Sequence, residues 1–82
     1  MAAVPQLTLY TKPDCHLCEE ALATLERLGR RYPHALQTVD ITSDPSLLER
    51  FRYRIPVLVI GGSEFGAPLT PSILQQALER SL

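Results

Sequence analysis

The sequence predicts one α/β domain, residues 1–82, in which four strands and three helices follow the order βαβαββα. Three observations lead to this fold class. Short runs of strand-forming residues alternate with stretches whose apolar residues recur every three or four positions. Two Asp-Pro or Thr-Pro pairs have the form of a helix cap followed by proline. A Gly-Gly-Ser turn separates the last two strands, as in a β-hairpin.

The first half of the chain predicts a strand, a long helix and a second strand. Apolar and hydroxyl-bearing residues alternate over 6–11, and Lys12-Pro13-Asp14 breaks the pattern. The next apolar residues recur with helical spacing, which predicts a helix over about 15–31. They are Cys18, Ala21, Leu22, Leu25 and Leu28. Residues 35–41 predict the second strand, which ends at a polar cluster.

The second half predicts a short helix, a hairpin and a final helix. Asp44 and Pro45 predict a helix over about 45–52, with its apolar residues facing inward. Residues 55–60 are apolar on both faces, as expected of a central strand, and Pro56 must stand at its beginning because it cannot donate to a ladder. The last helix is predicted from Pro71 to the end, with one apolar side. That side holds Ile73, Leu74, Ala77, Leu78 and Leu82.

These elements define a topology. Two strands joined by a helix of about 15 residues should be parallel with a right-handed crossover, whereas the closing hairpin must be antiparallel. We therefore expect one four-stranded mixed sheet flanked by three helices on its two faces.

Composition excludes several classes of protein. The net charge is −1 with 21% charged residues, so the basic surface that nucleic acids require is not expected. The longest apolar stretch, 55–62, is far below the ~20 residues of a membrane-spanning helix. The first six residues contain no Lys, Arg or apolar run, so no secretory signal is expected. We expect a cytoplasmic monomer that binds neither nucleic acid nor membrane.

The two cysteines form a Cys15-His16-Leu17-Cys18 motif where the first helix should begin. A separation of three residues brings the two Cβ atoms to about 5–6 Å, from which a disulfide can form. Cys18 falls on the apolar stripe and should be buried, whereas Cys15 should be exposed. The positive end of a helix lowers the pKa of a thiol below ~8.5, which makes Cys15 the predicted nucleophile. Lys12 and a protonated His16 would act in the same direction, and Asp14 would oppose them.

Other interpretations of the cysteine pair remain open. The pair could be structural, or it could bind a metal together with His16 and His34. That set lacks the ligand spacing of a tetrahedral zinc site, so no metal is predicted for a single chain. A dimer that shares zinc or a [2Fe-2S] cluster through Cys15 remains an alternative, as does a non-catalytic binding module.

Two segments resemble the glutaredoxin and thioredoxin superfamily, in particular its small glutaredoxin-like proteins. They are Leu9 to Cys18 and Arg54-Ile55-Pro56-Val57-Leu58, and the resemblance extends over essentially the whole chain. It implies a thioredoxin-like fold and a thiol–disulfide oxidoreductase with Cys15 as nucleophile and Cys18 as resolving cysteine. It further implies that Pro56 is the superfamily's cis-proline. The residues implied to contact substrate are Lys12, Pro13, His16, Ile55 and Pro56.

The sequence also departs from the superfamily. Glutaredoxins have a Gly-Gly pair and then an acidic residue that holds the glutathione amine, whereas residues 66–70 here contain no acid. The Trp that precedes the first cysteine in thioredoxins is replaced by Asp14. We therefore expect no cofactor and no dedicated use of glutathione. The expected partners are a protein or small-molecule disulfide and a reductant, either glutathione or a reductase.

Overall fold

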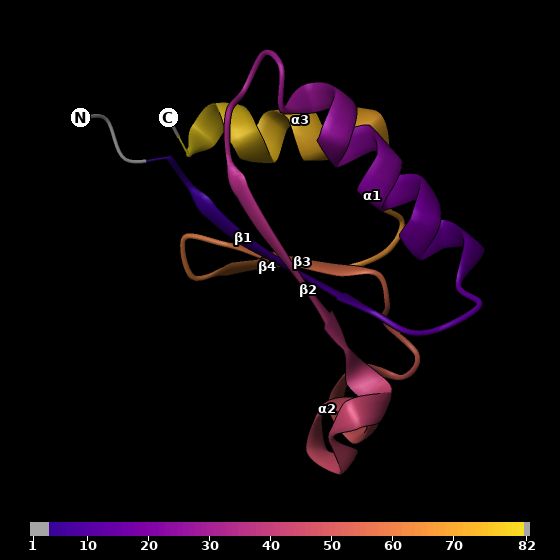
Figure 1. The fold of residues 1–82 in the computed structure, drawn as a ribbon. Helices are drawn as coiled ribbons and strands as arrows, with labels where there is room; N and C mark the ends of the chain where they lie inside the picture. The colour runs from indigo at the N-terminus through magenta and orange to yellow at the C-terminus, as the bar shows by residue number, and fades with distance from the viewer. Residues whose placement is uncertain (1–3, 82) are drawn as a thin grey trace.

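The computed structural model describes residues 4–81 and confirms the predicted α/β fold (Figure 1). Its elements follow the expected order, with one additional 3-10 turn, η1. They are β1 (Gln6–Thr11), α1 (His16–Leu28), β2 (Ala35–Asp40), η1 (Ile41–Ser43), α2 (Pro45–Phe51), β3 (Val57–Ile60), β4 (Ser63–Phe65) and α3 (Pro71–Arg80). Leu82, expected on the apolar side of α3, and the start of the N-terminal segment lie outside the described residues.

The four strands form one mixed sheet in the order β2-β1-β3-β4. β1 pairs in parallel with β2 and antiparallel with β3, and β3 pairs antiparallel with β4. The hairpin turn uses Gly61 and Gly62, both at positive φ, a conformation that glycine adopts without steric cost. The predicted strand directions are therefore correct.

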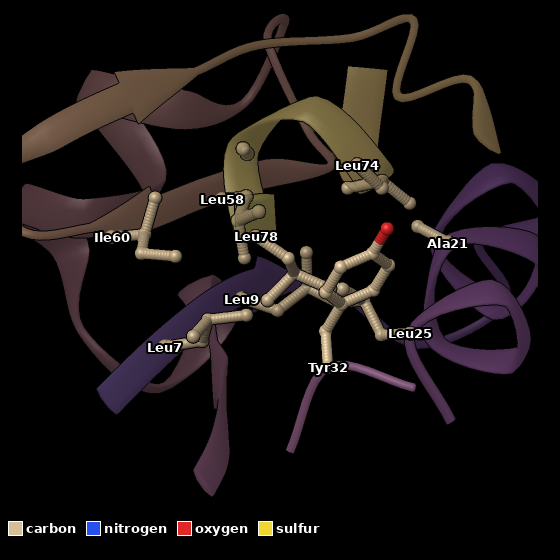
Figure 2. Packing of buried hydrophobic residues seen from close by; sticks show 10 residues of the cluster. Leu7, Leu9, Ala21, Leu25, Tyr32, Leu58, Ile60, Leu74 and Leu78 are labelled. Carbon is tan, nitrogen blue, oxygen red and sulfur yellow. The ribbon is translucent and has the colours of Figure 1, made fainter. Parts of the chain in front are cut away.

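Helices cover both faces of the sheet. α1 and α3 lie on one face and α2 on the other (Figure 1). Leu58 points to the first face, where it packs among residues of α1 and α3, while its neighbour Val57 packs against Phe51 on the second. Figure 2 shows Leu9, Leu25 and Leu58 converging in the larger cluster, together with side chains from α3. This alternation explains why the strand is apolar on both faces.

Several predicted boundaries were wrong by one to three residues, and three of these differences have a clear structural reason. α1 ends at Leu28 rather than near residue 31, because Gly29 caps it and the chain turns toward Tyr32. β2 ends at Asp40, one residue early, because its carboxylate accepts a hydrogen bond from the Thr42 N–H (2.8 Å) and starts η1. β3 begins at Val57, so that Pro56 precedes the strand.

The antiparallel pairing of β1 and β3 brings two loops to one edge of the sheet. Tyr10, near the end of β1, pairs with Val57, the first residue of β3. The turn from β1 into α1 and the segment that precedes β3 therefore meet at this edge. Between residues 4 and 81, the structure contains no helix with the length and apolarity needed to cross a membrane.

Candidate active site

Cys15 and Cys18 are joined by a disulfide at the N-terminus of α1. Cys15 is the residue that caps the helix, and its Sγ accepts a hydrogen bond from the Cys18 N–H at 3.2 Å. The Cα atoms of the two residues are 5.2 Å apart. The predicted proximity of the two sulfurs is confirmed, and one sulfur lies where the first backbone N–H groups of α1 point.

The two cysteines differ in exposure. Cys18 is buried, with 4% of its surface exposed, as its position on the apolar stripe predicted. Cys15 is half-buried rather than fully exposed. It still lies nearer to solvent, so an external disulfide reaches Cys15 before Cys18.

The turn that presents Cys15 has an unusual backbone. Asp14 adopts φ 59°, in the left-handed region, which is uncommon for residues other than glycine but tolerated by Asp and Asn. Lys12 and Pro13 precede it and are exposed. This turn redirects the chain from the edge of the sheet into α1 and leaves Cys15 at the helix start.

Ile55 and Pro56 lie in the segment that meets this turn. The peptide bond between them is cis. Pro56 is buried, and it lines the same surface hollow as Leu17. Leu17 and His16 are the two residues between the cysteines. Ile55 is half-buried, and its N–H donates to the Phe51 carbonyl at 3.2 Å. A substrate backbone at Ile55 would therefore rely on the carbonyl group.

His16 lies on the outer surface of α1. Its Nε2 is 3.1 Å from Glu20 Oε1, and 81% of its side chain is exposed. This pairing directs the imidazole along the helix toward Glu20. His34, the other histidine, is held near Tyr32, with Nδ1 2.8 Å from that residue's carbonyl oxygen. The described residues, 4–81, contain no cluster of three or more His, Cys, Asp or Glu side chains that could hold a metal ion.

One hollow adjoins the disulfide, and a second lies across α1 from it. The smaller, about 160 Å³, is lined by Cys15 and Cys18 together with Lys12, Glu19 and Thr38. The larger, about 500 Å³, lies on the other side of α1, between this helix and the segment that leads into α3. We call the larger one the α1 groove. Its walls include Leu17, Thr24, Arg27, Pro56, Pro68 and Leu69.

Sequence reasoning missed most of the α1 groove. Leu17 and Arg27 lie ten residues apart, and Pro68 joins them only through the tertiary fold. The one signal available was spacing, because Leu17, Glu20, Thr24 and Arg27 follow one another at three- and four-residue steps. These residues therefore share one face of α1, beside the buried stripe.

The fold and the cysteine pair define the chain as a thioredoxin-fold protein with a CxxC disulfide. More specifically, it belongs to the family described as Glutaredoxin-like domain (DUF836), whose model matches residues 6–82. The glutaredoxin-like resemblance and the thioredoxin-like fold are both confirmed.

Solved structures agree with this assignment. Target protein XcR50 from X. campestris is 32% identical, with a TM-score of 0.77, over 93% of this chain and 99% of that one. Protein Ne2328 from Nitrosomonas europaea is 25% identical, with a TM-score of 0.78 and 93% of each chain covered. Thioredoxin 1 from Thermosipho africanus TCF52B shares the fold, with a TM-score of 0.70 at 15% identity over 92% of this chain and 91% of that one.

Proposed function

We propose that this protein is a thiol–disulfide oxidoreductase in which Cys15 attacks and Cys18 resolves. One observation carries the proposal: the accessible sulfur caps α1 and is bonded to a buried sulfur one helical turn further on. The helix N-terminus stabilises a thiolate at Cys15, and burial keeps Cys18 from competing for external substrates.

The reaction begins with the reduced protein. The Cys15 thiolate attacks one sulfur of a substrate disulfide, whose other sulfur leaves as a thiolate and takes up a proton. Cys18 then loses its proton and attacks Cys15 Sγ, which releases the second substrate thiol. Two electrons pass to the substrate, and the protein is left with the Cys15–Cys18 disulfide that the structure shows.

The same site supports a role for the remaining predicted residues. Lys12 lines the small hollow beside both cysteines, where its ammonium group favours the Cys15 thiolate. Pro56 forms part of the wall of the α1 groove. The carbonyl group of Ile55 accepts a hydrogen bond from the substrate backbone. Pro13 and His16, exposed on either side of Cys15, contact the substrate at the rim.

The residues of the α1 groove also bear on which reductant regenerates the protein. The segment from Ala67 to Thr70, which lines it beside Pro56, contains no carboxylate to hold the glutathione amine. We therefore propose that glutathione is not a dedicated partner, and that a reductase or a general thiol regenerates the protein.

Substitution of each cysteine tests the function. Reduced wild-type protein should react with bis(2-hydroxyethyl) disulfide to give the intramolecular disulfide. Cys15→Ser should abolish the reaction, whereas Cys18→Ser should accumulate a mixed disulfide on Cys15, detected by intact mass. Wild-type rates in both variants would contradict the proposal. So would protein that purifies coloured with bound iron, the outcome expected of a dimer that shares a cluster through Cys15.

A further inference from the structure

The α1 groove is longer than the site needed for disulfide exchange alone. It begins at Leu17, next to the cysteines, and extends along α1 to Arg27. Ten residues at ~1.5 Å rise each correspond to about 15 Å along the helix. An extended peptide advances ~3.3 Å per residue, so about four to five residues fill this length. Its volume, about 500 Å³, lies within the range of ligand sites.

The two ends of the groove differ in chemistry. Leu17, at the disulfide end, is apolar, and the opposite wall adds the apolar residues Pro56, Pro68 and Leu69. Leu17 is unusual for an apolar side chain, because 56% of its surface is exposed. An occupant therefore gains by burying apolar groups next to its reactive cysteine.

The far end carries a cation. Arg27 is exposed, and its Nη2 donates to Thr24 Oγ1 at 3.1 Å, which fixes the guanidinium beside the groove. Glu20, the acid that lines the groove, is paired with His16 toward the disulfide end. Within residues 4–81, Arg27 forms no ion pair. The ion pairs in this part of the chain join His16 to Glu20, and Arg50 and Arg54 to Glu64. Its charge is available to an occupant.

We propose that the α1 groove binds an extended segment of a protein substrate, and that Arg27 selects segments with an acidic residue four or five positions from the reactive cysteine. This inference rests on the proposed oxidoreductase function and adds the substrate class. A tripeptide thiol is too short to reach from the disulfide to Arg27 in an extended conformation.

The test uses single-turnover reactions of the reduced protein with disulfide-bonded peptides. Each peptide has apolar residues beside its cysteine and Glu, Gln or Lys four or five positions away, on either side. The rate constant is divided by that for bis(2-hydroxyethyl) disulfide, which is too small to reach Arg27. An exposed ion pair predicts that one of the Glu peptides reacts about 1.4- to 5-fold faster than its Gln counterpart at low salt.

Substitutions of Arg27 test whether this residue causes the preference for Glu peptides. Arg27→Gln should remove the preference for Glu, Arg27→Lys should retain most of it, and Arg27→Glu should favour the Lys peptides. The matched control is Arg30→Gln, which removes an equal charge from an exposed arginine outside the groove and should leave the preference unchanged.

The outcomes separate the two proposals. Equal rates for Glu, Gln and Lys peptides, or the same loss in Arg30→Gln, would overturn the role of Arg27 while leaving the oxidoreductase function intact. A wild-type protein that reacts with neither peptides nor bis(2-hydroxyethyl) disulfide would overturn both.

Discussion

Cys15 differs from Cys18 in backbone position as well as in exposure. Cys15 has extended dihedral angles and stands before the first helical residue, whereas Cys18 lies within α1 on the stripe that packs into the core. The preceding residue, Asp14, has a left-handed backbone and adds an acidic side chain next to Cys15, the proposed nucleophile. We expect the helix N-terminus to favour a thiolate at Cys15 and the negative charge of Asp14 to disfavour it.

Replacement of Asp14 tests whether its carboxylate counteracts the effect of the helix N-terminus on the Cys15 thiol. Asp14→Asn removes the charge but keeps a side chain that tolerates the left-handed conformation. We expect the pKa of the Cys15 thiol to fall and alkylation of reduced protein by iodoacetamide at neutral pH to accelerate, by about 1.4- to 5-fold for an exposed charge. A slower reaction, with unchanged circular dichroism, would show that Asp14 supports the thiolate by another route.

At the scale of elements, two capping carboxylates hold the polypeptide that follows β2. Asp40 caps η1 and Asp44 caps α2, each through a hydrogen bond from the backbone two residues on. The helix α2 carries the chain to Phe51, whose carbonyl accepts the Ile55 N–H and so fixes the segment before Pro56. The two caps therefore act on the polypeptide that leads to the cis Ile55–Pro56 bond.

The Asp44 cap predicts a pH dependence. The N–H and hydroxyl of Ser46 donate to Asp44 Oδ1, both at 2.9 Å, and hold the pKa of this carboxyl below its usual 3.8. A lowered folded-state pKa contributes stability that is present above pH 3.8 and is lost as pH falls through the lower value.

The measurement is the urea midpoint between pH 6 and pH 2. Wild type should lose more stability over this range than Asp44→Asn, which retains a capping side chain that cannot ionise. Parallel midpoint curves for the two proteins would contradict this assignment. Circular dichroism at pH 6 checks that the variant is folded.

At the scale of the whole molecule, the sheet and its two covered faces were predictable from the sequence. Hydrophobic periodicity, the cap-proline pairs and the Gly-Gly-Ser turn located the three α-helices and the four strands of residues 4–81. The end of α1 was predicted too late. Gly29 alone did not mark it, because a further apolar residue, Tyr32, follows and is also buried. The extra turn at Ile41 escaped because this apolar residue continues the strand pattern of residues 35–40, while the Asp40 cap that starts η1 leaves no hydrophobic signal.

The candidate site was predictable only in its local part. Spacing and helix geometry placed Cys15 and Cys18, because both lie within one turn of a helix. The proximity of Pro56 was implied by the family resemblance and not by periodicity. The α1 groove depends on Pro68 and Leu69, which approach Leu17 and Arg27 only when α3 packs beside α1. The roles of Lys12, Pro13, His16 and Ile55 in substrate binding stay predictions.

The central claim is that the start of α1 activates one sulfur of the pair, and the most direct test is the pH dependence of Cys15 alkylation in fully reduced wild-type protein. Trace iodoacetamide, with mass spectrometry of the labelled peptide, reports the thiolate fraction at each pH. We predict selective labelling of Cys15 with a midpoint below the ~8.5 of a free thiol. A midpoint at or above that value, or equal labelling of Cys18, would contradict the account.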